Sequence, residues 1–335
     1  MKILIDLPVY EPLLNRLHAL EGVEVVVLDP ATEARELPVD MIRDVDLLLC
    51  TVPPSNHAEM KQLQLIQIAS AGYTQLIGQG FVPRGVRCCN ALGVFDVPIA
   101  EWNIAMMVQL ARNMKGMQQN QRQKIWNRSA RFQEEIRGKV IGLWGYGGIG
   151  RETARLAKAM GLSVFVLTRG GLKPRINTWH VPGTGDPEGL LPDRTFTMEE
   201  KDLFLSAIDF LIMAIPQTAG TEGIVGEAEL RLLKPSAFLL NPARGPLIRE
   251  AALIRALREQ WFAGAALDTH YYYPLPPEHP LWEMDNVILT PHISGSSASP
   301  HFLERVWNIF FENVQRFRDR RPLLNELSAD ALQGN

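Results

Sequence analysis

Short hydrophobic runs alternate along the first part of the chain with polar or amphipathic stretches. The runs predict strands at residues 2–7, 23–28, 45–50 and 63–69, and residues 13–20 have the spacing of an amphipathic helix. Strands that alternate with helices are typical of βαβ units, whose strands run parallel. We therefore predict a first α/β domain built on a parallel sheet.

A second series of hydrophobic runs starts near residue 140 and has the same rhythm. It predicts strands at residues 140–144, 164–167, 210–215, 237–240, 263–267 and 287–290. Residues 99–123 predict one long helix that joins the two series, and residues 300–318 predict a helix that returns to the first domain. The first domain is therefore expected to be discontinuous.

The length of the chain bears on the number of domains, and its charge bears on the kind of molecule that it binds. At 335 residues, the chain exceeds the size at which one hydrophobic core usually keeps growing, so two domains are expected. Its 34 Lys and Arg residues nearly balance 37 Asp and Glu residues, for a net charge of -3, which argues against nucleic acid or an anionic membrane as a partner. A small molecule is favoured instead.

Several features favour a cytoplasmic protein. Residues 1–6 enter a predicted strand without the pattern of a signal peptide, and no run reaches the roughly 18 apolar residues that a membrane span needs. Cys50 and the neighbours Cys88 and Cys89 do not form a disulfide framework, and buried small apolar residues are the simplest interpretation of them.

Residues 170–197 interrupt the rhythm of strands and helices. They are rich in Gly, Pro and Asp, and they are long for a loop in a compact domain. A lid or an oligomer contact would explain such a segment. A solvated surface insertion is the simpler alternative.

A glycine-rich turn follows the predicted strand at residues 140–144. It reads Gly145-Tyr146-Gly147-Gly148-Ile149-Gly150. Gly145 permits a tight turn, Gly147 lets the backbone approach a pyrophosphate, and Gly150 lets the next helix pack closely on the strand. Since an Ala-rich helical stretch follows, the pattern predicts a dinucleotide whose phosphates bind at a helix N-terminus.

The end of the next predicted strand bears on the choice of cofactor. NAD-specific sites usually carry an acidic residue about 20 residues after the turn, but Thr168 and Arg169 lie 18 and 19 residues after Gly150. A hydroxyl and a guanidinium suit the 2′-phosphate of NADP better than an acid does. We therefore expect NADP, with NAD as the alternative.

Two residues at strand ends fit the reduction of a 2-oxo acid. Such a reaction needs a cation for the carboxylate and a proton donor for the carbonyl oxygen. Arg244 follows the strand at residues 237–240, and His292 follows the strand at residues 287–290. Parallel sheets bind their ligands at the carboxyl ends of strands, so both residues are candidates for the site.

At this point the chain resembles the D-isomer-specific 2-hydroxyacid dehydrogenases, and the motifs occur in the family's order. The matching segments are Ile99-Ala100-Glu101, residues 138–142 before the glycine turn, Pro216-Gln217-Thr218 with Thr221, residues 241–245, residues 264–268, residues 286–288 and Thr290-Pro291-His292. So many ordered matches are far more specific than any one of them.

The resemblance implies roles for individual residues. Arg244 would bind the substrate carboxylate and polarise the carbonyl, and His292 would donate the proton. Asp268 would hold the carboxamide end of the nicotinamide. The cofactor would also contact Pro216, Thr221 and Ala243. Backbone N–H groups near Ala71 and Gly72 would help to hold the carboxylate, and a homodimer is implied, with residues 99–123 and Trp126 as a plausible contact.

One position departs from the family. Its catalytic His is normally paired with a Glu 29 residues after the Arg and just before a Pro, but Tyr273 stands there, before Pro274. A carboxylate would raise the pKa of the imidazole, whereas a phenol can only orient the ring. We expect Tyr273 to act in place of the Glu; otherwise, another acid such as Glu278 supplies the charge, or the aromatic residues simply line a pocket.

Two other functions are compatible with the resemblance. Formate dehydrogenases carry an Asn where this chain has Phe95, which disfavours them. A dinucleotide-sensing corepressor without turnover would not need both Arg244 and His292. We therefore predict two doubly wound parallel-sheet α/β domains: a Rossmann cofactor domain at residues 102–295, inserted in a flavodoxin-like substrate domain at residues 1–101 and 296–335. The predicted activity is an NADPH-dependent 2-oxo acid reductase that needs no metal.

Overall fold

The computed structural model describes residues 1–129 and 133–333, and these form two compact units. The helices and strands are β1 (Lys2–Asp6), α1 (Glu11–His18), β2 (Glu24–Val27), α2 (Val39–Ile42), β3 (Leu47–Cys50), β4 (Leu65–Ile68), β5 (Arg87–Cys89), α3 (Asp96–Ala111), α4 (Met114–Gln123), β6 (Val140–Trp144), α5 (Gly148–Ala159), β7 (Ser163–Leu167), β8 (Arg194–Phe196), α6 (Lys201–Ala207), β9 (Phe210–Met213), α7 (Glu227–Arg231), β10 (Phe238–Asn241), α8 (Glu250–Arg258), β11 (Gly264–Leu267), β12 (Val287–Leu289), α9 (Pro300–Arg318) and α10 (Ala329–Gln333).

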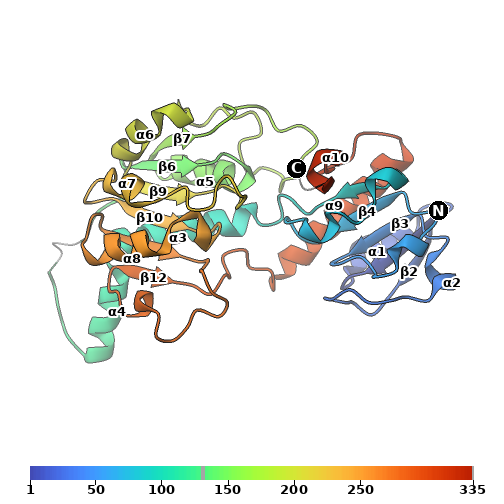
Figure 1. Cartoon of the computed structure of the whole chain (residues 1–335), viewed down its shortest axis with the longest axis horizontal. Coiled ribbons are helices and arrows are strands. Elements are labelled where there is room, and N and C mark those ends of the chain that lie inside the picture. The colour runs from blue at the N-terminus through green and yellow to red at the C-terminus, as the bar shows by residue number, and fades with distance from the viewer. Residues whose placement is uncertain (130–132, 334–335) are drawn as a thin grey trace. The chain divides into compact units, whose positions relative to one another are not determined.

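Unit 1 consists of Met1–Phe95, Ile176–Val181 and the chain from Ser297 onward. Its five strands are parallel in the order β2-β1-β3-β4-β5, which is the flavodoxin-like order (Figure 1). Alternate residues of β1 enter two different cores. Ile3 and Ile5 pack with α1 and α9 on one face, and Leu4 packs on the other.

Unit 2 consists of Asp96–Arg175 and Pro182–Ser296. Seven parallel strands lie in the order β12-β11-β10-β9-β6-β7-β8, the doubly wound order of dinucleotide-binding domains. Helices α3 and α5 cover one face through a core that includes Ile141 and Leu143. Helices α6, α7 and α8 cover the other face through a core that includes Trp144 and Leu239 (Figure 1). The predicted pair of parallel-sheet α/β domains is confirmed.

The structure differs from the pattern at the predicted helix of residues 99–123. That stretch is two helices, because Asn113 adopts a left-handed conformation with φ 47° and its side chain accepts from the Gly116 N–H at the start of α4. The first helix, α3, starts at Asp96 and packs against α5, so residues 96–101 belong to unit 2 although we expected them in the first domain. Residue 296 also lies in unit 2.

Residues 170–197 are divided between the units. The partly buried Trp179 packs against the core of unit 1, and its backbone N–H donates to Asn325 Oδ1 at 3.0 Å. Gly93 lies so close to Trp179 that a Cβ there would collide with the Trp179 carbonyl oxygen. The residues on both sides of this segment belong to unit 2. Parts of the insertion are therefore anchored by packing and hydrogen bonds, while other side chains in it, such as Ile176 and Leu190, are exposed.

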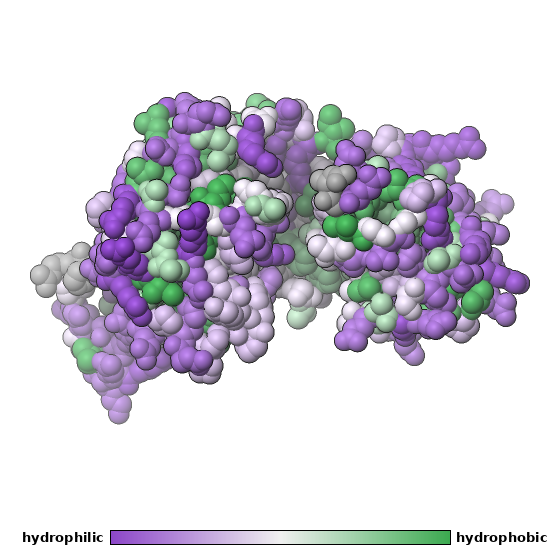
Figure 2. All heavy atoms as spheres, viewed as in Figure 1, coloured by the Kyte–Doolittle hydropathy of each residue, from purple (hydrophilic) through white to green (hydrophobic). Residues whose placement is uncertain are grey.

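Hydrophilic residues predominate on the visible surface, with hydrophobic residues scattered among them (Figure 2). Among residues 1–129 and 133–333, the most exposed large hydrophobic side chains are Trp126 at 90%, Leu190 at 81% and Ile176 at 77%. In the part of the chain that the structure describes, no helix has the length and hydropathy to cross a membrane. Cys50, Cys88 and Cys89 are buried, and burial raises the pKa of each thiol, that of Cys88 to about 12.

Candidate functional site

The glycine turn has the geometry that phosphate binding requires. Gly145 has φ 102°, and a Cβ there would lie 2.5 Å from the Ala214 carbonyl oxygen. A Cβ on Gly150 would lie 2.7 Å from the Gly145 carbonyl oxygen, so only glycine permits the contact between helix and turn. Gly147, at the N-cap of α5, is exposed and would have open space around a Cβ. Backbone N–H groups thus face an open site at the helix N-terminus, which fits a dinucleotide pyrophosphate.

The other residues of the turn have different surroundings. Tyr146 is buried, and its hydroxyl donates to the Asp186 carboxylate at 2.6 Å, so its side chain points into the protein. Gly148 lies against the Asp96 carboxylate, which a Cβ would overlap. Ile149 is half-buried on α5. The Tyr146 side chain therefore holds the surrounding structure, so this residue could contact an anion only through its backbone.

Thr168 and Arg169 lie directly after β7, at the carboxyl edge of the sheet. The backbone N–H of Thr168 donates to the Phe196 carbonyl at 3.1 Å. This bond is made by the backbone, so the Thr168 hydroxyl takes no part in it. Arg169 is exposed. Both positions suit contact with the adenosine ribose, which in this topology lies at the end of the second strand.

Arg244 lies in a loop that Asn241 organises at the end of β10. The Asn241 Oδ1 accepts from the N–H groups of Ala243 at 3.1 Å and Arg244 at 3.3 Å, and its Nδ2 donates to the Arg244 carbonyl at 2.8 Å. The Arg244 side chain is exposed, and its Nη1 donates to the Ala243 carbonyl at 2.7 Å. Most donors of the guanidinium are therefore directed to solvent, where a substrate carboxylate can be bound.

His292 follows β12, and Asp268 at the end of β11 fixes its loop. The fully buried Asp268 carboxylate accepts from the Thr290 hydroxyl at 2.6 Å, the Ile293 N–H at 2.9 Å and the Ser294 N–H at 3.0 Å. The His292 N–H donates to the Asp268 carbonyl at 2.7 Å. These bonds hold His292 in a left-handed conformation with φ 56°, which is uncommon for a residue other than glycine and often marks a functional site.

Arg244 and His292 interact electrostatically. Partial desolvation lowers the pKa of His292, the Arg244 guanidinium lowers it further, and His270 adds to the decrease, while Asp268 opposes it. A pKa below the usual range means that the neutral imidazole dominates at neutral pH. Among the described residues, no carboxylate forms an ion pair with the His292 ring.

Tyr273 contacts the ring of His292 directly. The two ring centroids are 5.6 Å apart with an interplanar angle of 59°. The Tyr273 hydroxyl accepts from the His270 backbone N–H at 3.4 Å. At the position where the family resemblance leads us to expect a Glu, a phenol ring therefore packs against the imidazole.

Sequence reasoning missed His270, which lies between Asp268 and Tyr273 and is 7% exposed. Its Nε2 lies 2.8 Å from the Thr290 carbonyl and must carry the proton, since a carbonyl only accepts. Its Nδ1 is buried without a partner among the described residues. His270 thus joins the chain after β11 to the chain after β12 through this bond to Thr290. A second histidine two residues after Asp268 was the available signal.

Thr221 and Pro216 form a turn after β9. The Thr221 hydroxyl donates to the Pro216 carbonyl at 2.8 Å and accepts from the Thr218 N–H at 2.8 Å. In unit 1, the Ser70 hydroxyl donates to the Gly72 carbonyl at 2.6 Å, and Asn90 Nδ2 donates to the Ala71 carbonyl at 2.7 Å. Both turns follow strands, as expected for residues that contribute backbone groups to a binding site.

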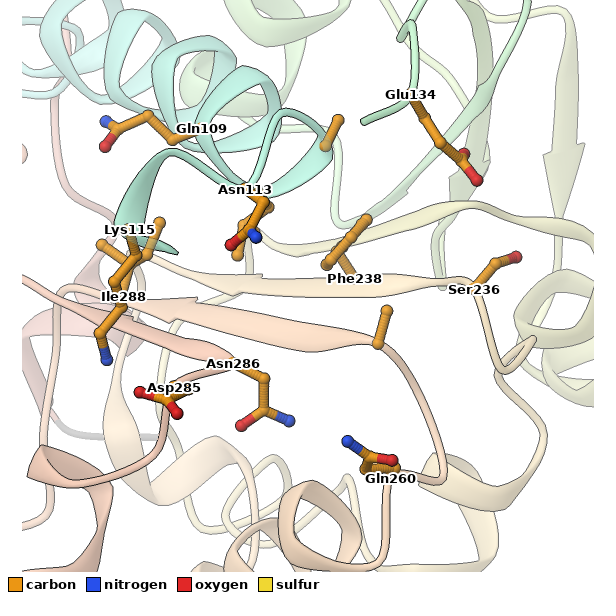
Figure 3. Close-up of a pocket in the computed structure, with 13 residues that line it drawn as sticks. Gln109, Asn113, Lys115, Glu134, Ser236, Phe238, Gln260, Asp285, Asn286 and Ile288 are labelled. Atoms are coloured by element: carbon orange, nitrogen blue, oxygen red, sulfur yellow. The ribbon is translucent and has the colours of Figure 1, made fainter. Parts of the chain in front are cut away.

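The cavity in Figure 3 has a volume of about 460 Å³ and lies elsewhere in unit 2. Phe238 starts β10 and Asn286 precedes β12, so the cavity is at the amino ends of the strands, whereas Arg244 and His292 follow the carboxyl ends. At one side, the Lys115 ammonium donates to the carbonyls of Met284 at 2.6 Å and Val287 at 2.8 Å, bonds that hold α4 to the sheet. The chemistry therefore does not depend on this cavity.

Comparisons with known proteins identify the family of the chain. The profile of the family described as D-isomer specific 2-hydroxyacid dehydrogenase, NAD binding domain, matches residues 104–294. A glyoxylate reductase of Thermofilum pendens is 32% identical over 272 residues, which span 79% of this chain and 76% of that protein.

Solved structures have the same fold over almost the whole chain. The TT0316 protein from Thermus thermophilus is 26% identical with a TM-score of 0.72, and the match covers 98% of this chain and 100% of that chain. An NADPH-dependent glyoxylate/hydroxypyruvate reductase from Sinorhizobium meliloti, solved with citrate, is 26% identical with a TM-score of 0.71, over 98% of this chain and 97% of that chain.

Proposed function

The chain belongs to the D-isomer-specific 2-hydroxyacid dehydrogenases, a family of NAD(P)-dependent oxidoreductases, and we propose that it reduces a small 2-oxo acid with NADPH. The family that the sequence motifs indicated is thereby confirmed. The observation that carries the proposal is the placement of Arg244 and His292 after the carboxyl ends of β10 and β12 of a dinucleotide-binding sheet, with the His292 loop held by the Asp268 carboxylate. A cation for the substrate and a proton donor are then available at the same edge of the sheet as the glycine turn.

The bound dinucleotide supplies a hydride to the carbonyl carbon of the 2-oxo acid. Arg244 binds the substrate carboxylate through its free donors and draws electron density from the adjacent carbonyl. His292 donates the proton that the carbonyl oxygen takes up, which leaves a neutral imidazole and a hydroxyl group. The Asp268 carboxylate keeps His292 in place through the three hydrogen bonds to its loop. D-stereochemistry and binding of the carboxylate by backbone groups near Ala71 and Gly72 are part of this proposal.

Tyr273 gives the reaction a different pH dependence from that of a Glu-bearing relative. Packing against a phenol leaves the pKa of His292 lowered by desolvation and by Arg244. Protonated His292, the proton donor, is therefore lost as the pH rises through the lowered pKa of His292. That pKa lies below the ordinary value for histidine of about 6.5. Reduction is favoured at mildly acidic pH, and oxidation of the hydroxy acid, which needs neutral His292, is favoured above it.

The choice of NADPH rests on Arg169. This exposed guanidinium follows β7, where NAD-specific sites present a carboxylate, and it can pair with a 2′-phosphate. A relative whose name states NADPH dependence supports the same choice. Names of relatives also point to glyoxylate and hydroxypyruvate as substrates.

A steady-state screen of glyoxylate, hydroxypyruvate, pyruvate and phenylpyruvate, each with NADPH and NADH, tests the proposal. We expect turnover of at least one of the two-carbon or three-carbon acids and a lower KM for NADPH. Arg169→Gln should raise the KM for NADPH with little effect on NADH. No turnover with any acid would overturn the activity, and a strong preference for NADH in the wild type would overturn the role of Arg169.

A further inference from the structure

The insertion after β7 brings an arginine to the phosphate-binding turn. Asp96 is 6% exposed, and its carboxylate lies directly against Gly148 at the N-terminus of α5. Arg175, in the insertion, has Nη1 3.5 Å from the same carboxylate. Because Gly148 belongs to the glycine turn, the Arg175 guanidinium is close to the helix end where a pyrophosphate binds.

The insertion is held firmly enough to present this side chain. The Arg175 backbone N–H donates to the Pro187 carbonyl at 2.9 Å. Arg151, 5% exposed on the first turn of α5, donates to the carbonyls of Lys173, Asp186 and Pro187. Both sides of the loop around Arg175 are thereby tied to the helix that starts at the turn.

A second carboxylate completes the attachment. Asp186 is 7% exposed and accepts from the Tyr146 hydroxyl at 2.6 Å and from the N–H groups of Gly189, Leu190 and Leu191 at 3.0 to 3.1 Å. Tyr146 is itself a member of the glycine turn. The turn and the insertion therefore form one connected structure.

The charges near the turn indicate what the arrangement does. Asp96 and Asp186 are two buried carboxylates close to a site for a doubly charged pyrophosphate, and a nearby cation would reduce the repulsion between these charges. Arg151 uses its donors on backbone carbonyls. Among the described residues, the guanidinium of Arg175 makes only the long contact to Asp96, and 15% of the side chain is accessible. Its remaining donors can therefore bind a phosphate.

We propose that Arg175 is a cofactor-binding residue that pairs with the pyrophosphate of the nicotinamide dinucleotide, with Asp96 as the residue that positions it. This inference rests on the proposed function. Arg175 and Arg169 then have separate tasks: Arg175 binds the group that NADPH and NADH share, and Arg169 binds the 2′-phosphate that only NADPH has. The insertion is a part of the cofactor site.

Equilibrium titration with NADPH and with NADH, followed by nicotinamide fluorescence, tests this division. We expect Arg175→Gln to raise the Kd of both dinucleotides by about tenfold, the effect of one charge-assisted hydrogen bond. Arg169→Gln should raise only the Kd for NADPH. Lys173→Gln is the matched control, because it removes one positive charge from the same segment at an exposed side chain, and it should change neither Kd by more than about twofold.

Salt dependence separates a phosphate contact from a merely structural role. Loss of a phosphate contact should flatten the dependence of Kd on ionic strength, which a local distortion would leave unchanged. If Arg175→Gln unfolds at a lower temperature than the wild type, Arg175→Met is the second variant, because it keeps much of the aliphatic stem. It should raise the Kd of both dinucleotides in the same way. Unchanged Kd values in both Arg175 variants, or a loss confined to NADPH, would overturn the inference. If the wild type bound neither dinucleotide, the proposed function itself would fail.

Discussion

At the scale of single residues, the proposed chemistry depends on the surroundings of His292. The ordered motifs located Arg244 and His292, because both follow hydrophobic strands at the edge where parallel sheets bind ligands. Two interactions could not be predicted from the sequence. The Asp268 carboxylate accepts hydrogen bonds from three donors in the His292 loop, and His270 bonds to the Thr290 carbonyl. Both depend on how β11 and β12 pair.

Tyr273→Glu should restore the pH dependence that the family's usual Glu would provide. A carboxylate beside the imidazole favours its charged form, so the pKa of His292 should rise by about one unit or more. Because reduction needs protonated His292, the fall of kcat/KM for glyoxylate reduction should move to higher pH by the same amount. A pH profile of kcat/KM measures the shift.

Tyr273→Phe is the control for this substitution. It keeps the ring contact with His292 and removes only the hydroxyl that accepts from the His270 N–H, so the pH limb should stay where it is in the wild type. A wild-type profile that stays level well above pH 7 would contradict the assignment of Tyr273.

At the scale of elements, the strongly hydrophobic strands, including the three-residue β12, and α9 were predictable, and two less hydrophobic short strands and the break between α3 and α4 were not. Residues 300–318 form α9 as expected. The three-residue strands β5 and β8 escaped prediction, because segments that are both short and less hydrophobic leave too little pattern to recognise, and β8 is exposed at two of its three positions. The break at Asn113 depends on a side-chain cap that hydrophobic spacing does not reveal.

Two substitutions in the glycine turn should separate folding from binding. Gly150→Ala would put a Cβ 2.7 Å from a backbone oxygen, which should lower the free energy of unfolding by about 1–3 kcal/mol. Gly147→Ala has open space and a negative φ of -77°, so it should leave the free energy of unfolding nearly unchanged.

Gly147→Ala should nevertheless weaken dinucleotide binding, because its methyl group would stand where the pyrophosphate approaches the backbone. Urea unfolding measures the first effect, and titration with NADPH measures the second. Equal destabilisation by the two substitutions, or full affinity in Gly147→Ala, would show that the turn is only a structural glycine turn.

At the scale of the whole molecule, composition and rhythm predicted two α/β domains, and these are confirmed. The expected boundaries at residues 101 and 295 were derived from motifs, and they differ from those of the compact units, because α3 packs along its whole length in unit 2. Nothing in the pattern of residues 170–197 could show that Trp179 packs against the core of unit 1, since that depends on contacts distant in sequence.

We expect the protein to be a homodimer, as its family resemblance implies. Trp126 is 90% exposed and Ile125 is 51% exposed just after α4, an unfavourable arrangement for side chains of this size unless a partner covers them. Light scattering at micromolar concentration should give twice the mass of the 335-residue chain, and Ile125→Ser with Trp126→Ser should weaken the association. A monomeric wild type would contradict this expectation.

The division of residues 170–197 between the units limits how the protein can be recombined. The polypeptide passes from one unit to the other after residues 95, 175, 181 and 296, so neither unit is one continuous segment of the chain. A chimaera that exchanged residues 96–296 for the cofactor domain of a relative without the insertion would remove Trp179 from its place against the core of the recipient and leave an empty space there. If the cofactor domain of a relative is exchanged into this protein to change its cofactor preference, residues 176–181 must therefore stay with the substrate domain.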